Sequence, residues 1–322
     1  MRVVIALDGS TSAEQGLRLA ETLLTGKESH IVLMHVLPRH FIYGKGGPVP
    51  IECYDADDVR TDGKALLDAA TARLKVAGAG TTIEQNIVAG HPADLILKTA
   101  TEPHADLIIL GSRGLNGAQR FLLGSVSHRV SQHAHCTVLV AHAQAPRPTR
   151  RDRPGSAMLK VLVAIDGSTV ADHALDVACT LLSGIGVEVT LLHVIPRHLV
   201  VGRGGLVPAE CYDVDIEQEA AQALVDSRLP RLQQGGIGPT LQTEIAIGDP
   251  AEVILDVAEE NGVDLIVLGG RGVSNAERWL LGSVAHKVAT HAGCSVLIVP
   301  RAPGMTRLKT VVQPTGSSAR RA

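Results

Sequence analysis

Residues 107–125 read LIILGSRGLNGAQRFLLGS, and residues 265–283 read LIVLGGRGVSNAERWLLGS. Each stretch has an apolar run, a loop with the glycine spacing G-x2-G-x9-G, and a closing serine where a helix-like pattern begins. The second copy follows the first by 158 positions, as Gly111 and Gly269 show. Solenoid repeats are only about 20–50 residues long, so a period of this length predicts a duplicated domain.

The same offset holds along the rest of the two copies, without a gap. Residues 6–10 (ALDGS) return as residues 164–168 (AIDGS), and His35-Val36 returns as His193-Val194. A chain of 322 residues suits two domains of about 100–200 residues each. We therefore expect a first domain at 1–142, a stiff Pro- and Arg-rich linker at 143–157, a second domain at 158–300, and a disordered basic tail at 301–322.

Strand-like apolar runs alternate with helix-like runs in both halves, which predicts βαβ units and a parallel sheet. Ligands of such folds bind beyond the carboxyl ends of the strands, so Asp8, His35-Val36 and Gly111 should share one rim. In the first half the expected strands are Val3–Leu7, Ile31–Val36, Thr82–Val88, Asp106–Leu110 and Thr137–Ala141, and the expected helices are Ser12–Leu24, Asp62–Ala77, Pro92–Thr101 and Ser125–Ala134. In the second half the expected strands are Val161–Ile165, Val189–Val194, Gln242–Ile247, Leu265–Leu268 and Ser295–Val299.

The composition argues against nucleic acid and membrane as partners. The net charge is −3, and aromatic residues make up 2% of the chain, which leaves few rings for base stacking. Apolar runs all fall short of the ~20 residues of a membrane helix, and the N-terminus lacks a signal-peptide pattern. The five cysteines form no CxxC pair, which indicates a reducing, cytoplasmic compartment. We expect Cys136 and Cys294, which begin apolar runs, to be small core residues.

The glycine loop has the features of a phosphate site. Glycines let the backbone approach a ligand closely or adopt positive φ, and the free N–H groups of a following helix favour an anion. The strand–loop–helix context occurs twice, so chance is a weaker explanation than for a single match. The loop is not a Walker motif, because Gly-Lys-Ser/Thr does not close it, and the first strand is not followed by GxGxxG.

At these residues the chain resembles the ATP-binding branch of the universal stress protein family, whose motif is G-x2-G-x9-G-S/T. The resemblance extends to Asp8 and Asp166, to the two His-Val pairs, and to Gly90-x-Pro92-Ala93 with its repeat, and it covers nearly everything except linker and tail. The chain looks like a tandem member. The resemblance implies an α/β fold with two tandem Rossmann-like domains, related to the adenine nucleotide α-hydrolases. Each would have a five-stranded parallel sheet with helices on both faces.

The resemblance also implies roles for individual residues, with ATP and its Mg²⁺ as cofactors. In the first half, Ala6, Leu7 and Asp8 would line adenine and ribose, Val36 would contact adenine, and Gly111, Ser112, Arg113, Gly114, Arg120, Gly124, Ser125 and Val126 would form the ribose and phosphate site. In the second half the same roles would fall to Ala164, Ile165, Asp166, Val194, Gly269, Gly270, Arg271, Gly272, Arg278, Gly282, Ser283 and Val284. One departure is that Ser112 becomes Gly270, so a hydroxyl contact there exists only in the first half.

Several of these residues have a purely structural alternative. The glycines would then only shape a turn, Asp8 would only hold the turn before a helix, and His35 and His193 would be satisfied core histidines. We interpret His128, His133, His286 and His291 as surface or interface residues, because their i, i+5 spacing suits a metal poorly.

A long repeated segment at residues 38–58 and 196–216 has three interpretations. It packs on its own or the twin domain, it forms a lid with Lys45 or Arg203 near the phosphates, or it holds a metal with His40, Glu52, Cys53 and Asp55.

The sequence therefore predicts a cytoplasmic, nucleotide-dependent stress or signalling module that binds two ATP molecules. It shows no strong catalytic constellation, so we expect at most a slow ATPase. Two alternatives stay open. One is a nucleotide α-hydrolase-like enzyme such as an adenylyltransferase, although its SGGxDS and HxGH signatures are absent. The other is a dimerising scaffold without nucleotide. We expect the halves to pack through Thr137–Ala141 and Ser295–Val299 as a pseudo-two-fold pair, and a further homodimer is left open.

Overall fold

The computed structural model describes most of both repeats and little of the segments between them. The described residues are 1–38, 41–44, 47–50, 56–101, 104–114, 123–143, 158–196, 200–202, 205–207, 214–237, 240–272 and 281–301. Nearly all of the predicted linker and tail lies outside these ranges, so both stay predictions.

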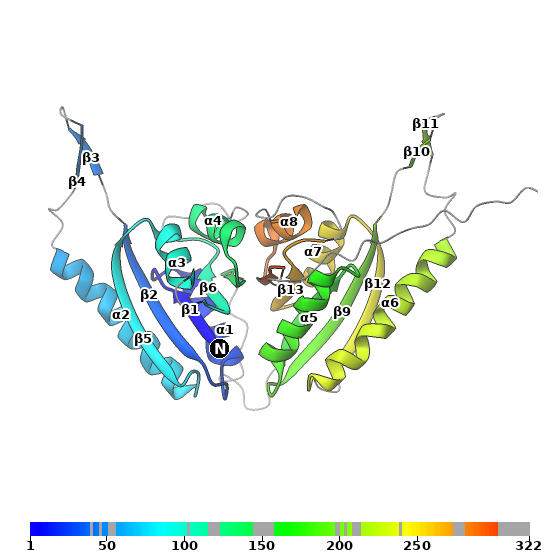
Figure 1. Cartoon of the computed structure of the whole chain (residues 1–322), viewed down its shortest axis with the longest axis horizontal. Coiled ribbons are helices and arrows are strands. Elements are labelled where there is room, and N and C mark those ends of the chain that lie inside the picture. Colours follow the sequence, from blue (N-terminus) through cyan, green and yellow to red (C-terminus); the bar gives the residue numbers. More distant parts are fainter. Residues whose placement is uncertain are drawn as a thin grey trace, which may run out of the picture.

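Each half is a five-stranded parallel sheet with helices on both faces, as the sequence predicts (Figure 1). The first half contains β1 (Arg2–Ala6), α1 (Thr11–Leu23), β2 (His30–Pro38), α2 (Ala56–Val76), β5 (Thr82–Gly90), α3 (Pro92–Thr101), β6 (Leu107–Gly111), α4 (Ser125–His133) and β7 (Thr137–Ala141). The second half contains β8 (Leu159–Ile165), α5 (Thr169–Leu182), β9 (Val187–Pro196), α6 (Val214–Gln234), β12 (Leu241–Gly248), α7 (Pro250–Glu260), β13 (Leu265–Gly269), α8 (Ser283–His291) and β14 (Ser295–Val299).

The two sheets join through their last strands into one ten-stranded sheet. Strands β7 and β14 pair antiparallel, with Leu139 opposite Leu297 and Val138 opposite Ile298. Leu297 is the repeat of Leu139, so the pairing places equivalent residues face to face, as a two-fold axis requires. The predicted pseudo-two-fold interface is therefore confirmed.

Two apolar layers hold the helices against the sheet, one on each face, and each layer runs through both halves. One layer contains Leu17 of α1 and Leu67 of α2, and the other contains Ile96 of α3 and Val130 of α4. Strand residues alternate between the faces, so neighbours in a strand enter different layers. This explains why β7, which is buried along its whole length, is apolar after Thr137.

Two features differ from the sequence prediction. Helix α2 begins at Ala56 rather than Asp62, because residues 56–61 carry too few apolar side chains to show a helical period. The segment expected to be one long loop contains a hairpin, β3 (Phe41–Gly44) with β4 (Gly47–Pro50), repeated as β10 (Val200–Gly202) with β11 (Gly205–Val207). The prolines in Gly47–Pro50 argue against a strand in the middle of a sheet, but an isolated two-stranded hairpin has only edges.

The histidines of the last helices meet at the junction of the halves. The His128 ring of α4 contacts the His286 ring of α8 edge to face, with centroids 5.1 Å apart. His133 and His291 are exposed. The interpretation of this set as surface and interface residues is confirmed. Within the described residues, none of the helices is long and apolar enough to cross a membrane.

Candidate functional site

The turn after β1 places an acidic side chain at the carboxyl end of the sheet. The Ser10 N–H donates to Asp8 Oδ1 at 3.0 Å, and the Ala13 N–H donates to Ser10 Oγ at 3.2 Å, so Ser10 caps α1. Gly9 has φ +81°, a conformation that glycine adopts without strain. Asp8 therefore has the structural role of holding the turn before α1, and it does so through Oδ1.

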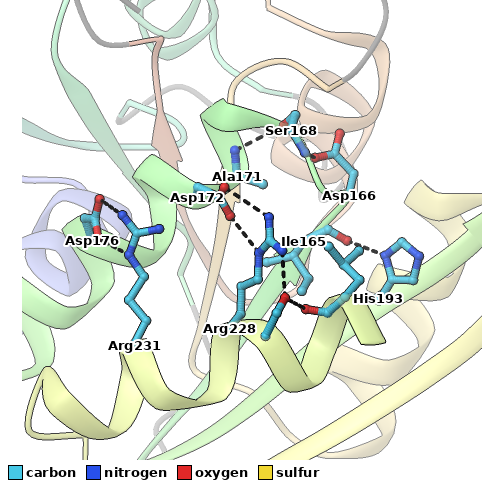
Figure 2. A network of polar contacts seen from close by, with 11 residues as sticks. Ile165, Asp166, Ser168, Ala171, Asp172, Asp176, His193, Arg228 and Arg231 are labelled. Carbon is cyan, nitrogen blue, oxygen red and sulfur yellow. Dashed lines mark hydrogen bonds and ion pairs between the residues drawn. The ribbon is translucent and has the colours of Figure 1, made fainter. Parts of the chain in front are cut away.

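The second half repeats this turn, as Figure 2 shows. The Ser168 N–H donates to Asp166 Oδ1 at 2.9 Å, and the Ala171 N–H donates to Ser168 Oγ at 3.1 Å. Gly167, with φ +78°, takes the place of Gly9. In both halves the second carboxylate oxygen, Oδ2, faces the glycine loop.

The second glycine of the motif lies directly against that carboxylate. A Cβ at Gly114 would stand 2.9 Å from Asp8 Oδ2, and a Cβ at Gly272 would stand 2.5 Å from Asp166 Oδ2. The structure thus brings together two predicted site residues that are more than a hundred positions apart. Close approach is the reason for glycine here, because Gly111, Gly114 and Gly124 do not have positive φ. Of the two possibilities that the sequence leaves open, close approach or positive φ, the structure shows close approach.

The other two glycines are also sites of close approach. A Cβ at Gly111 would stand 2.5 Å from Ser12 Oγ and 2.7 Å from the Ala13 nitrogen, so the end of β6 packs on the start of α1. The Gly124 N–H donates to Ser112 O at 2.7 Å, and the Gly282 N–H donates to Gly270 O at the same distance. The loop therefore returns to the strand from which it left.

Helices α4 and α8 begin at this point with free N-terminal N–H groups facing the rim. Their N-cap residues are Gly124 and Gly282, which have no side chain to accept a hydrogen bond. Ser125 and Ser283, the first helical residues, are exposed, and Val126 and Val284 are half-buried. The first N–H groups of a helix lack intrahelical partners and attract anions, so both helix starts can hold a phosphate.

Hydroxyl groups of α1 fasten the loop in the first half. Ser10 Oγ donates to Arg113 O at 3.0 Å, and Ser12 Oγ donates to the same carbonyl at 2.6 Å. Ser127 Oγ, on α4, is 2.8 Å from Ser112 O and 3.0 Å from Gly124 O. Sequence reasoning did not single out Ser12 or Ser127. The sequence feature that could have identified them is a difference between the repeats, since the equivalent residues are Val170 and Ala285.

The residues expected around adenine lie on neighbouring strand ends. The Leu7 N–H donates to Met34 O at 2.8 Å, which joins the end of β1 to β2. Ala6 and Val36 are half-buried on these two strands; of their repeats, Ala164 is half-buried and Val194 is buried. Leu7 and Ile165 are buried.

The two His-Val histidines have a structural role. His35 Nδ1 lies 2.7 Å from Leu7 O, and His193 Nδ1 lies 2.9 Å from Ile165 O (Figure 2). A carbonyl accepts, so Nδ1 carries the proton in both rings. These bonds confirm the interpretation of both as satisfied histidines that fix the strand ends beside the site.

Two arginines of the motif flank the second glycines, and two lie outside the described residues. Arg113 and Arg271 are half-buried. Burial and the nearby Arg301 lower the pKa of Arg271. Arg120 and Arg278, and residues 115–122 and 273–280 around them, are not described.

The described ranges contain no cluster of three or more His, Cys, Asp or Glu that could hold a metal ion by itself. The residues of the lid and metal interpretations of the repeated segment, Lys45, Arg203, His40, Glu52, Cys53 and Asp55, lie outside those ranges. Cys294 is a buried cysteine outside any disulfide, as expected, and Cys136 is half-buried, with burial raising its pKa to about 12.

Comparison with known proteins gives one consistent result. The model of the universal stress protein family matches residues 1–142 and 158–300. Universal stress protein YxiE of Bacillus subtilis is 38% identical over 148 residues, which are 44% of this chain and 97% of that protein. Universal stress protein Rv2005c of Mycobacterium tuberculosis is 27% identical over 302 residues, 93% of this chain and 96% of that protein.

A solved structure has the same fold along the whole chain. It is a universal stress protein from Archaeoglobus fulgidus, with a TM-score of 0.61 and 23% identity. The match covers 94% of this chain and 96% of that one.

Proposed function

Because the chain belongs to the universal stress protein family, we propose that each half binds one adenine nucleotide, ATP with Mg²⁺, and that the chain acts as a nucleotide-dependent stress-response or signalling module. The observation that supports this most is the close approach of the first-strand acid to the second motif glycine: a Cβ at Gly114 would stand 2.9 Å from Asp8 Oδ2, and a Cβ at Gly272 would stand 2.5 Å from Asp166 Oδ2. In both halves, any side chain at the glycine position would fill the space in front of the aspartate Oδ2.

The rim divides into a nucleoside end and a phosphate end. The ends of β1 and β2, with Ala6, Leu7 and Val36, offer an apolar surface and backbone groups for adenine. Asp8 Oδ2 offers an acceptor for ribose hydroxyls. The loop at Gly111 and Gly114 and the start of α4 at Ser125 offer backbone N–H groups for the phosphates.

Mg²⁺ would arrive with the nucleotide and neutralise part of the phosphate charge. The protein groups that fit this complex are backbone N–H groups and the Arg113 and Arg271 side chains, which suit phosphate oxygens. Positioning of this kind supports binding and at most slow hydrolysis. The cytoplasmic location stays a prediction from the cysteine pattern.

Titration calorimetry with Mg-ATP tests the proposal, and we expect about two sites per chain. Mass spectrometry of ligand released from freshly purified protein identifies a nucleotide that is carried through purification. No binding at millimolar ATP would refute the proposal and favour the scaffold alternative. Release of pyrophosphate in the presence of a co-substrate would instead favour an adenylyltransferase.

A further inference from the structure

We propose that Ser12 is a positioning residue for the phosphate end of the first site, and that its replacement by Val170 makes the two sites unequal. The first site would be the tight one, and the second would be the one that exchanges its nucleotide. This inference rests on the proposed nucleotide binding. Ser12 lies on α1, outside the glycine motif; its Oγ hydrogen-bonds to the backbone of Arg113 and also lies against Gly111.

The hydroxyl of Ser12 is buried and directed at one peptide group. Ser12 is 4% exposed, and its Oγ lies 2.6 Å from Arg113 O. The Ser10 hydroxyl, 3.2 Å from that of Ser12, reaches the same carbonyl oxygen at 3.0 Å. The Arg113 N–H also points at Ser12 Oγ, at 3.3 Å. Two hydroxyls therefore hold one carbonyl against the start of α1.

The orientation of that carbonyl determines the orientation of the next N–H group. A trans peptide is planar, with its C=O and N–H pointing in opposite directions. Because the Arg113 carbonyl points toward α1, the Gly114 N–H points away from α1, on the exposed side of the loop. That side is where a phosphate would lie, in front of the start of α4.

The second half keeps the backbone hydrogen bonds at the described ends of the loop and lacks the hydroxyl of Ser12. The Ser112 N–H donates to Ala141 O and the Gly270 N–H donates to Val299 O, each at 2.7 Å. Ser168 keeps the position of Ser10. Ser125 is likewise kept as Ser283, whereas Ser12, Ser112 and Ser127 are replaced by Val170, Gly270 and Ala285.

The described ends of the two loops thus have equivalent backbone hydrogen bonds, and we infer that they differ in how firmly the residue before the second glycine is held before a ligand arrives. A binding group that is already oriented loses less entropy on binding, so the first site gains affinity for the part of the ligand that the loop contacts. That part is the phosphate chain, since adenine lies at the other end of the rim. Loss of the Ser12 hydroxyl should weaken ATP binding about tenfold and leave adenosine binding unchanged.

A reciprocal exchange between the repeats tests this with side chains that the fold already accepts. Ser12→Val is made with the second site weakened by Gly272→Val, and Val170→Ser with the first site weakened by Gly114→Val. Ser12→Thr keeps the hydroxyl and is the matched control. Calorimetry with Mg-ATP and with adenosine gives the dissociation constant of each ligand for each variant.

We expect Ser12→Val to weaken ATP about tenfold at constant adenosine affinity, Ser12→Thr to restore it, and Val170→Ser to tighten ATP at the second site. Equal losses for ATP and adenosine, or wild-type ATP affinity in Ser12→Val, would overturn the inference while the proposed function stands. Unchanged ATP affinity in Val170→Ser would overturn the assignment of the inequality to this hydroxyl. Absence of ATP binding in the wild-type chain would overturn the proposed function and this inference with it.

Discussion

The outer helices of the two halves meet through different ion pairs at equivalent places. In the first half, Arg73 of α2 binds Glu14 and Glu21 of α1, each at 2.6 Å. In the second half, Arg231, the repeat of Arg73, binds Asp176 at 2.6 Å, and Arg228 binds Asp172 at 3.0 Å (Figure 2).

The repeat position of Asp176 is Arg18, so the sign of the charge is reversed there, and Glu21 becomes Cys179. Each half nevertheless joins its two helices by Arg–carboxylate pairs. The two halves therefore share the backbone path of this helix pair, whereas the partners of its ion pairs differ from one half to the other. The glycine loops differ in the same way, and the predictions below test where the halves are equivalent and where they are not.

The largest effect is expected at the β7–β14 junction, where the halves pair with each other. Val138 and Val296 are 2% and 0% exposed. An aspartate at either position would bury an unpaired carboxylate between the halves. This should destabilise the junction by about 4 kcal/mol or more. Separately expressed residues 1–142 and 158–300 should associate or homodimerise, and Val138→Asp and Val296→Asp should weaken this equally, measured by light scattering.

Soluble monomeric halves with native circular dichroism would contradict the interface. A clear difference between the two aspartate variants would contradict its two-fold character. Val76→Asp, at a position 75% exposed on α2, is the control and should leave association unchanged.

This interface could be predicted because its evidence is local. Thr137–Ala141 and Ser295–Val299 are apolar after their first residue, and an apolar strand at a free edge is prone to aggregate. The strand–helix alternation and the glycine loop are visible for the same reason, since each depends on residues close together in the chain. The Ser12 contact with Arg113 joins residues 101 positions apart, so a local sequence pattern does not predict it.

Other failures have equally physical causes. The sequence shows glycine at Gly114 and at its repeat, Gly272, but it does not show whether a positive φ or a close neighbour requires glycine there. In the structure the close neighbour of Gly114 is Asp8. The ion pairs of the outer helices could not be deduced from the repeat, because the charge at Arg18 and Asp176 changes sign. The sequence does not predict the start of α2, because a helical period is recognised from apolar residues and residues 56–61 have few of them.

The second prediction separates the two sites. In Gly114→Val the new side chain would enter the space before Asp8 Oδ2, and in Gly272→Val it would meet Asp166 Oδ2 at even closer range. Each change should cost its own site about 2–3 kcal/mol of ATP binding, about 30- to 150-fold, and leave the other site intact. Calorimetry should show one strong site instead of two in each variant.

Gly293 provides a matched control, because a Cβ there would meet no atom within 4 Å. Gly293→Val should therefore bind two nucleotides with wild-type affinity. Unchanged ATP affinity at the first site of Gly114→Val, measured with the second site disabled, would contradict the site assignment.

The third prediction concerns a histidine that exists in the first half only. His142 follows β7, is 6% exposed, and its Nε2–H donates across the junction to Ala289 O at 3.0 Å; its repeat is Pro300. Burial lowers the pKa of His142 from 6.5 to about 4. The unfolded chain then binds more protons between these values, so the free energy of unfolding is highest above pH 6.5 and falls as the pH drops toward 4.

Between pH 7.5 and pH 5 this group should account for about 2 kcal/mol of lost stability. Urea unfolding at the two pH values measures the loss, and His142→Gln should show a difference smaller by about that amount. The His128–His286 contact adds a smaller dependence of the same sign, because burial and the neighbouring His128 and His291 lower the pKa of His286. An unchanged pH difference in His142→Gln would show that the acid sensitivity lies elsewhere.

The smallest effect should come from the two equivalent arginines of the outer helices. Arg73 is 33% exposed and binds Glu21, which is 14% exposed, whereas Arg231 and Asp176 are 44% and 46% exposed. Loss of Arg73 leaves a largely buried carboxylate without its cation, while loss of Arg231 breaks a pair that water already screens. Arg73→Ala should therefore lower the free energy of unfolding by about 1–2 kcal/mol, and Arg231→Ala by about 0.2–1 kcal/mol. Urea unfolding in low salt and in 0.5 M NaCl should show the Arg231 effect shrinking with salt and the Arg73 effect persisting. Equal, salt-sensitive losses in the two variants would mean that the two helix pairs are held equally firmly despite their different partners.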